Sequence, residues 1–200
     1  MSDIEIVLAS ASSSRRIMLE AAGVTFTVVA PNVDEDLMKD MLMGGSAPAP
    51  RIADALAEAK ALAGSERHPA AVVIGADQVL AAGGRIFSKA LDEDEARATL
   101  LALRGRTHEL ISAAVIARAG KAIWRRTETA TMRMREFSDE FLDEYLTAEI
   151  PEVLGSVGCY RIEGRGAQLF SEISGDHFCI RGLPLIGVLA ALREQGALLP

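Results

Sequence analysis

The sequence has little of what disulfide-linked, metal-bound or membrane-spanning proteins need. Only two cysteines, Cys159 and Cys179, and three histidines occur, and neither set has the spacing of a metal-ligand motif. The first ten residues, MSDIEIVLAS, contain no basic segment and no long apolar run, so we expect no signal peptide and no transmembrane helix. Because two cysteines form no disulfide framework, we expect a reducing, cytoplasmic compartment.

Positive charge is also scarce. The chain has 21 lysines and arginines against 28 aspartates and glutamates, which gives a formal net charge of −7 at pH 7. A negative surplus disfavours nonspecific binding to nucleic acid and to anionic membrane surfaces. We therefore expect neither of them as a partner.

Apolar residues are plentiful. Half of the 200 residues are hydrophobic, which is enough to bury a sizeable core in one domain spanning residues 1–200. Strand-like and helix-like segments alternate, and a long hairpin predicted over residues 108–136 turns at Gly120. A hairpin embedded among β–α units predicts an α/β fold with one mixed sheet. The predicted helices cover residues 13–22, 51–63, 92–103 and 185–195, and another is capped by Ser138 and contains Phe141 to Leu146. A polar loop is expected at 31–36 and a mobile Gly/Pro/Ala-rich connection at 41–50.

The segment LASASSSRR, residues 8–16, joins a predicted strand to a predicted helix. Serines often cap helices and arginines often solvate them, which is one explanation of the segment. The other explanation is a bound anion, because a helix N-terminus presents free backbone N–H groups and the positive end of the helix dipole.

Asp77 follows directly after the apolar run AVVIGA, which we interpret as a buried strand. Open α/β sheets bind ligands at the carboxyl ends of their strands, so Asp77 is a candidate to hold a divalent metal or to take a proton from water. An aspartate that caps a turn is the alternative. Glu35, in the acidic loop NVDED, is a second candidate metal ligand, although such loops are commonly only solvated.

Three further charged residues have both an ordinary and a functional interpretation. Lys60 lies at the edge of an apolar helix face and Lys89 lies in a loop, where lysines usually extend into water. Glu163 lies in a Gly-rich stretch, residues 155–166, that lets backbone approach a ligand but matches neither a P-loop nor a dinucleotide fingerprint. Taken together, these cations, carboxylates and glycines suit a polyphosphate with its metal.

Several segments, in order and over nearly the whole chain, resemble the Maf nucleotide pyrophosphatases. LASASSSRR is similar to the N-terminal motif of that family, AEAKA to its helix lysine segment and GADQVL to its catalytic segment. The stretches SKALDEDEARATLLALRGRTHEL and VGCYRIEGRGAQLFSEISGDHFCIRGLPLIGVLAAL resemble two further family motifs. The resemblance implies an enzyme that hydrolyses a nucleoside triphosphate to the monophosphate and pyrophosphate with Mg²⁺ or Mn²⁺. It also implies an elongated α/β fold with a cleft between two lobes, and a possible homodimer.

The resemblance also implies roles for individual residues. Asp77 matches the proposed proton acceptor of the family and is, with Glu35, our candidate metal ligand. Positions implicated in phosphate and metal binding are matched by Ser10, Arg15, Lys60 and Lys89, and positions that track substrate choice by Ser14, Gln78 and Glu163. The planar guanidinium of Arg15 would suit phosphate oxygens at the helix N-terminus.

The residues at the substrate-choice positions favour a particular base. Gln78 and Glu163 resemble the branch of the family that acts on 7-methyl-GTP. A carboxylate only accepts hydrogen bonds, so Glu163 suits the adjacent N–H donors of guanine better than the edge of uracil or thymine. We therefore expect 7-methyl-GTP or another non-standard nucleotide as substrate. The alternative function is a nucleotide-sensing regulator of cell division or septum formation that binds without turnover.

Overall fold

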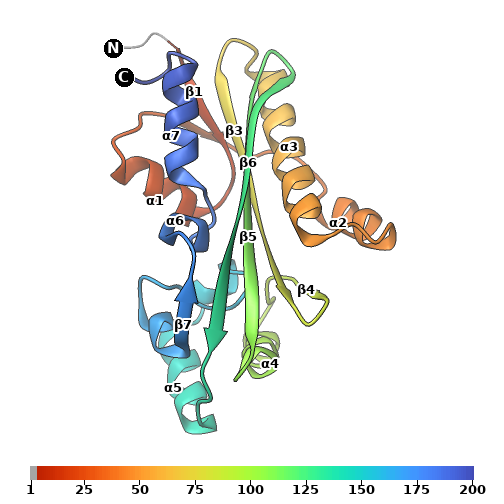
Figure 1. The fold of residues 1–200 in the computed structure, drawn as a ribbon, viewed down its shortest axis with the longest axis vertical. Helices are drawn as coiled ribbons and strands as arrows, with labels where there is room; N and C mark the ends of the chain where they lie inside the picture. The colour runs from red at the N-terminus through yellow and green to blue at the C-terminus, as the bar shows by residue number, and fades with distance from the viewer. Residues whose placement is uncertain (1–3) are drawn as a thin grey trace.

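The structure, a computed structural model that describes residues 4–200, is built on one seven-stranded mixed sheet (Figure 1). The strands pair in the order β2-β1-β3-β5-β6-β7, and β4 pairs with β3. The strands are β1 (Ile6–Ala9), β2 (Thr27–Val29), β3 (Val72–Ala82), β4 (Arg85–Phe87), β5 (Thr107–Arg118), β6 (Lys121–Met134) and β7 (Phe170–Ser174). The predicted mixed α/β class is confirmed, because β1 runs parallel to β2 and β3 while the later pairs are antiparallel.

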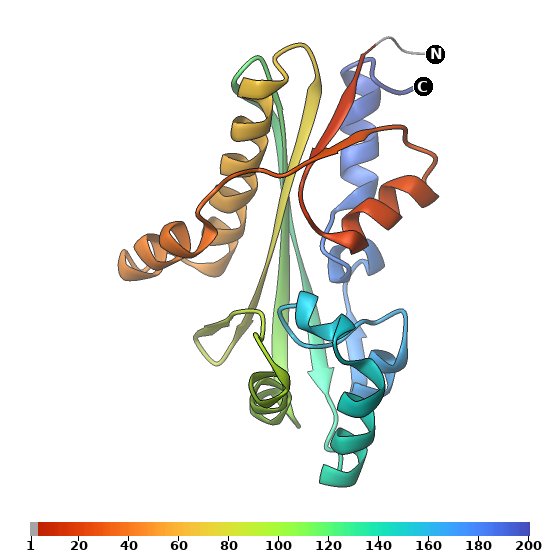
Figure 2. The same ribbon diagram turned by 180° about the vertical axis from the view of Figure 1, so that it is seen from behind.

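Helices cover both faces of the sheet. They are α1 (Ser13–Ala21), α2 (Glu35–Gly44), α3 (Ala49–Arg67), α4 (Glu93–Leu103), α5 (Asp139–Glu149), α6 (His177–Ile180) and α7 (Leu185–Glu194), with two 3-10 turns at Glu152–Gly155 and Arg165–Leu169. At one end of the molecule, α1 and α7 lie on one side of the long strands and α3 lies on the other (Figure 2). The helices α4 and α5 lie at the opposite end (Figure 1). None of the helices in residues 4–200 has the length and apolar character needed to cross a bilayer.

Alternation along β3 and β5 separates the buried side chains into layers. Ile74 and Ala76 pack with α1 and α7, whereas Val79 packs with residues of α3. Successive residues of a strand point to opposite faces, so one strand serves both layers. A third and larger cluster, at the other end of β3 and β5, includes residues of α4 and α5. These separate cores are consistent with the expected two lobes.

One edge of β3 has a gap that positions the site. The pairing of β1 with β3 ends where Ala9 faces Gly75, and the pairing of β4 begins at Leu80. Between these points, the structure of residues 4–200 provides no strand along the edge of β3 at residues 76–79. Backbone groups at an open edge need other partners.

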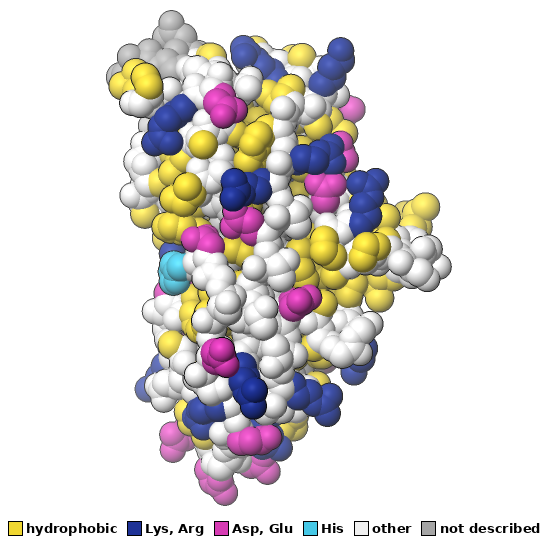
Figure 3. All heavy atoms as spheres, in the orientation of Figure 1, with side chains coloured by type: hydrophobic (Ala, Val, Ile, Leu, Met, Phe, Trp, Pro, Cys, Tyr) yellow, Lys and Arg dark blue, Asp and Glu magenta, His cyan; other side chains and the backbone are white. Residues whose placement is uncertain are grey.

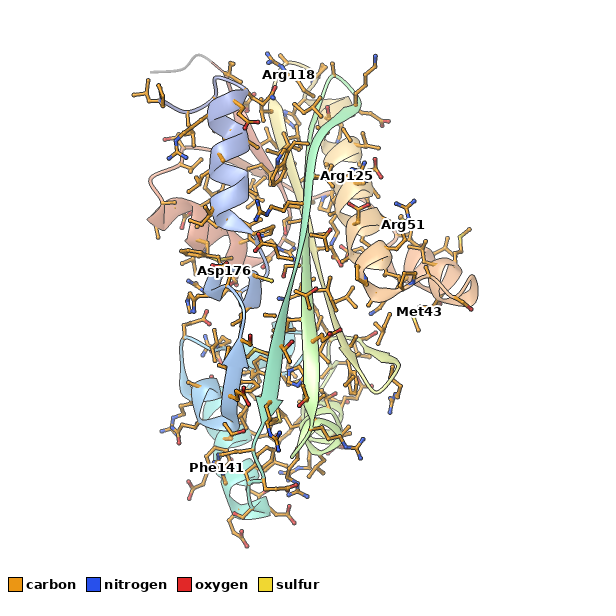
Figure 4. All side chains as sticks on the ribbon, viewed as in Figure 1. Met43, Arg51, Arg118, Arg125, Phe141 and Asp176 are labelled. Atoms are coloured by element: carbon orange, nitrogen blue, oxygen red, sulfur yellow. The ribbon has the colours of Figure 1, made fainter. Side chains whose placement is uncertain are left out.

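Helix α3 is fixed closely against the sheet. A Cβ atom on Gly75 of β3 would overlap the backbone oxygen of Ala57 in α3, so only glycine permits this approach. On the outer side, Arg125 reaches from β6 to α3, where its guanidinium lies 2.8 Å from Asp54 and 2.6 Å from Glu58 (Figure 4). These contacts fix the position of α3 on the sheet and therefore the position of Lys60, the residue of α3 that reaches Asp77.

The structure corrects two sequence-based expectations near the site. Residues 41–50 are not one mobile connection, because α2 continues to Gly44 and α3 begins at Ala49. The Asp34 carboxylate accepts from the backbone N–H of Leu37 and caps α2, so Glu35 begins a helix instead of lying in a loop. The sequence did not indicate helix α2 because its apolar residues Met38 and Leu42 contact a distant segment: they pack against the cluster under α3.

The predicted hairpin at Gly120 is confirmed, and Ala119 and Gly120 both have positive φ, as a tight two-residue turn requires. Both cysteines are free and buried, and burial raises the pKa of each thiol to about 11.

Hydrophobic side chains appear among the charged ones around the projecting helix α2 (Figure 3), where Met41 is 70% exposed.

Candidate functional site

A cavity of about 560 Å³ lies at the gap in the edge of β3. Its volume falls within the usual range for a small-molecule site. Every site residue that the sequence suggested lines this cavity, namely Ser10, Ser14, Arg15, Glu35, Lys60, Asp77, Gln78, Lys89 and Glu163. Residues separated by up to 153 positions of sequence are thus brought to one place.

The ammonium of Lys60 joins two carboxylates inside the cavity. Its Nζ lies 2.7 Å from Oδ1 of Asp77 and 2.8 Å from Oε2 of Glu35. The side chains of Lys60 and Asp77 are only 5% and 10% exposed, whereas Glu35 is half-exposed. A buried carboxylate requires such a partner, and the arrangement leaves Oδ2 of Asp77 outside this hydrogen bond.

Arg15 supplies a hydrogen bond to the open edge of β3. Its Nη1 donates to the backbone oxygen of Ala76 over 2.9 Å and to Oγ of Ser10 over 3.0 Å, while Nε donates to the backbone oxygen of Gly182 over 2.8 Å. Burial lowers the pKa of this guanidinium, and the negative charges of Asp77 and Glu35 act in the opposite direction. Arg15 is therefore a rigid cation whose position is set by neutral oxygens.

Lys89 brings a second lysine to the cavity from the loop before α4. The residue is exposed, yet desolvation of its ammonium lowers its pKa, and the positive charge of Arg15 lowers it further. The loop is tied to α2, because Nζ of Lys39 donates to Oγ of Ser88 over 2.9 Å. The positive charges of Arg15, Lys60 and Lys89 thus act on one space, as a polyphosphate site requires.

Asp77 lies within a strand instead of after it, contrary to the sequence-based expectation. Strand β3 continues to Ala82 because its pairing with β5 is unbroken. The polar residues at positions 77 and 78 lie where the opposite edge of β3 has no neighbouring strand. Alternation sends Asp77 toward α3 and Gln78 toward α6. Both side chains still line one cavity, because the missing neighbour strand opens the edge of β3 between its two faces.

Four consecutive backbone oxygens hold the other side of the cavity. Those of Cys179 and Ile180 accept from the Gln78 amide over 3.1 and 3.0 Å. The next two, of Arg181 and Gly182, accept from Oγ of Ser14 over 3.0 Å and from Nε of Arg15 over 2.8 Å. One short segment, residues 179–182, therefore orients the side chains of Ser14, Arg15 and Gln78.

Sequence reasoning missed Arg181, which also lines the cavity. Its Nε lies 3.5 Å from Oε1 of Glu163, and this distance is long for a hydrogen bond. The same Nε is buried and has no hydrogen-bond partner among the described residues. The signal in the sequence was a single cation inside the otherwise apolar run FCIRGLPLI.

A buried histidine supports the wall of the cavity. The hydroxyl of Tyr160, which lines the cavity, lies 2.6 Å from Nε2 of His108. Burial lowers the pKa of His108 to about 4, so its imidazole is neutral at pH 7. The structure thus shows this histidine in contact with Tyr160, whose position it supports.

The donor set for a metal ion is limited. Within residues 4–200, no group of three histidine, cysteine, aspartate or glutamate side chains is arranged to hold a metal ion. Glu35 and Asp77 do converge on one point, where the ammonium of Lys60 lies. Mg²⁺ is commonly held by one or two carboxylates together with substrate phosphates, so this pair fits a cation that arrives with a nucleotide.

Comparisons with known proteins identify the family. The family described as Maf-like protein matches residues 5–195. A protein of Caulobacter vibrioides named nucleoside triphosphate pyrophosphatase is 51% identical over 99% of both chains. A protein of Granulibacter bethesdensis with the same name is 48% identical over 98% of this chain and 99% of its own. A protein of Mesorhizobium japonicum named 7-methyl-GTP pyrophosphatase is 46% identical over 97% of this chain and 98% of its own. With its family motifs gathered in one cavity and full-length relatives at this level of identity, the chain belongs to the Maf family.

Proposed function

We propose that the protein hydrolyses a nucleoside triphosphate to the nucleoside monophosphate and pyrophosphate. The observation that carries the proposal is a buried carboxylate, Asp77, among three cations in a nucleotide-sized cavity. A protein that only bound a nucleotide would gain little from burying a carboxylate beside its phosphates, because the two repel each other. The names of the relatives from Caulobacter vibrioides and Granulibacter bethesdensis agree with this reaction.

The proposed chemistry assigns a role to each of the charged side chains, and the resemblance to the family supports an attack at the α-phosphorus. Asp77 takes a proton from a water molecule through Oδ2, the carboxylate oxygen that does not accept the hydrogen bond from Lys60. The oxygen of this water bonds to the α-phosphorus, and the bond from that phosphorus to the bridging oxygen of the β-phosphate breaks. Arg15, Lys60 and Lys89 stabilise the negative charge on the departing pyrophosphate.

A divalent cation is part of this proposal. Glu35 and Asp77 would hold Mg²⁺ or Mn²⁺ together with oxygens of the substrate phosphates. Such a cation neutralises phosphate charge and so lowers the barrier to hydrolysis. For Asp77 to serve a cation, the ammonium of Lys60 must turn toward the phosphates, which its flexible stem allows.

The base-binding part of the site contains a hydrogen-bond acceptor. Glu163 lines the cavity and is 40% exposed, so its carboxylate is available to a ligand. A carboxylate accepts two adjacent N–H donors, which guanine and 7-methylguanine present side by side. The relative from Mesorhizobium japonicum is named for 7-methyl-GTP, which supports a guanine-type base here.

The test is a panel of nucleoside triphosphates, 7-methyl-GTP included, with Mg²⁺ or Mn²⁺, scored for release of pyrophosphate. We expect pyrophosphate from at least one nucleotide and none without the cation. In Asp77→Asn, we expect turnover to be lost while the fold and nucleotide binding remain. Tight binding without product from any nucleotide would favour the non-catalytic regulator, and an Asp77→Asn rate above about a tenth of wild type would exclude Asp77 as the base.

The remaining expectations also belong to this proposal. Two free, buried thiols support a reducing compartment such as the cytoplasm. A homodimer, suggested by the resemblance to the family, stays a prediction that sedimentation at several protein concentrations would test.

A further inference from the structure

Arg181 carries a positive charge into the part of the cavity where Glu163 lies. Its side chain is only 16% exposed, and its Nε has no hydrogen-bond partner among the described residues. A buried donor without a partner costs free energy in the unliganded protein. The nearest acceptor, Oε1 of Glu163, lies at 3.5 Å and pairs with Arg181 by charge more than by a hydrogen bond.

The backbone around Arg181 is held firmly. Its own carbonyl oxygen accepts from Ser14 and the next one accepts from Arg15. On the N-terminal side, the Asp176 carboxylate, labelled in Figure 4, caps α6 by accepting from the backbone N–H of Cys179 over 2.9 Å. Because its backbone is anchored on both sides and its side chain is largely buried, Arg181 is kept beside Glu163, as ligand recognition requires.

We propose that Arg181 is a specificity residue that, paired with Glu163, reads a neutral guanine and disfavours the cationic base of 7-methyl-GTP. The proposal rests on the proposed function and deepens it, because it names the base. It differs from the expectation drawn from Glu163 alone, which favoured the methylated nucleotide.

The donor and acceptor pattern of guanine matches the pair. Guanine presents the acceptor O6 beside the donors N1–H and N2–H. The guanidinium of Arg181 donates to O6, and the carboxylate of Glu163 accepts from the two N–H groups. Uracil and thymine offer one N–H between two acceptors, so one carboxylate oxygen would face a carbonyl. Adenine lacks the N1–H donor.

Charge separates guanine from its 7-methyl form. Methylation at N7 makes the ring cationic, and an isolated Glu163 would attract it. The 3.5 Å ion pair already compensates the charge of Glu163, and Arg181 repels a second cation nearby. The pair therefore removes the electrostatic advantage of the methylated base.

The experiment compares GTP with 7-methyl-GTP, two nucleotides that differ only by the methyl group and its charge. We expect the ratio of kcat/KM for 7-methyl-GTP over GTP to rise roughly tenfold or more in Arg181→Leu. Arg181→Lys keeps the charge but loses the planar donor, so GTP hydrolysis falls and 7-methyl-GTP hydrolysis does not rise. Arg16→Leu removes an exposed charge that pairs with Glu20 on α1 and is the control, with an unchanged ratio. An unchanged ratio in Arg181→Leu overturns the proposal.

Binding separates this proposal from the proposed reaction. The dissociation constants of the same two nucleotides are measured by titration calorimetry in Asp77→Asn and in Asp77→Asn with Arg181→Leu. If the protein releases no pyrophosphate but the Kd ratio shifts toward 7-methyl-GTP when Arg181 is lost, the proposed reaction fails and the assignment of Arg181 holds. Equal Kd ratios in the two variants refute the assignment, whatever the turnover.

Discussion

Nζ of Lys60 lies 2.7 Å from Oδ1 of Asp77, and both side chains are almost fully buried. The lysine comes from a helix and the aspartate from a strand of the sheet, 17 positions apart in sequence. Lys60 is the direct counter-charge of Asp77 and also pairs with Glu35, and burial makes an unpaired charge costly. The pair thus belongs both to the site and to the fold. Removing Lys60 should therefore affect stability as well as activity, whereas removing Lys89 should affect activity alone.

Lys60→Ala and Lys89→Ala should differ in their effect on stability, whereas both should lower the rate of pyrophosphate release. Lys60→Ala leaves Asp77 buried without its partner and should lower the free energy of unfolding by about 2 kcal/mol. Lys89 is exposed, so Lys89→Ala should change it by less than about 0.5 kcal/mol. Both variants should release pyrophosphate at least roughly tenfold more slowly, because each loses a cation near the phosphates. Urea titration and a pyrophosphate assay measure the two effects, and equal stability losses would contradict this distinction.

Glu163→Gln should shift substrate choice toward uridine or thymidine triphosphate. A glutamine amide both donates and accepts, so it matches the edge of uracil or thymine, which a carboxylate does not. A mismatched buried polar edge costs about 1–3 kcal/mol, so relative kcat/KM should change by roughly ten- to a hundredfold. The measurement is the ranking of kcat/KM over GTP, UTP and TTP. A wild-type preference for TTP, or the same ranking in both proteins, would show that Glu163 does not read the base.

Gly75→Ala should destabilise the protein through the contact of α3 with β3. The added Cβ would overlap backbone atoms of Ala57 and Ala61, which cannot move aside without shifting the helix. We expect a loss of about 3 kcal/mol in unfolding free energy. Gly44→Ala is the matched control, because nothing lies within 4 Å of its Cβ position, and it should change stability by less than about 1 kcal/mol. Thermal and urea unfolding measure both, and a neutral Gly75→Ala would mean that α3 does not pack as described.

Stability should fall in mild acid because of His108. Burial lowers its pKa to about 4, whereas the unfolded chain binds the proton near pH 6.5. Below that value the unfolded state binds more protons, so stability is lost as the pH falls from about 6.5 toward 4. The contribution between pH 7 and pH 5 is about 2 kcal/mol. His108→Gln keeps a partner for the Tyr160 hydroxyl and should lose less stability over this range in urea titrations, whereas equal losses would exclude His108 as the cause.

The residues that the sequence suggested do line one cavity, but the local structure around two of them differs from the expectation. Asp77 was singled out for its place after an apolar run and does line the cavity, but the end of its strand was not predictable. Where β3 ends depends on its pairing with β5, which is a contact between distant segments. The same reason hid the helical start at Glu35, because the packing of Met38 and Leu42 against α3 stabilises α2.

Arg181 shows what a pattern along the chain cannot predict. Its role depends on Glu163, 18 positions earlier, and on a backbone whose carbonyl oxygens are held by residues near the N-terminus. No local periodicity contains that information. Ser10, Arg15, Lys60 and Lys89 were recognisable from the resemblance, since each lies in a short segment with its own signature.

The unbroken pairing of β3 with β5 limits how the cavity can respond to a ligand. The ladder runs from Val73 to Ala81, past the cavity and into both halves of the molecule. Rotating one half against the other would break hydrogen bonds along this ladder, so the strands act as a rigid spine without a hinge. Adjustment to a nucleotide is therefore left to the periphery, to α2 and residues 152–163, and the distance between the proposed base and phosphate sites stays fixed. A fixed distance of this kind favours ligands whose base and phosphates are separated by a matching length, in addition to any selection by the base itself.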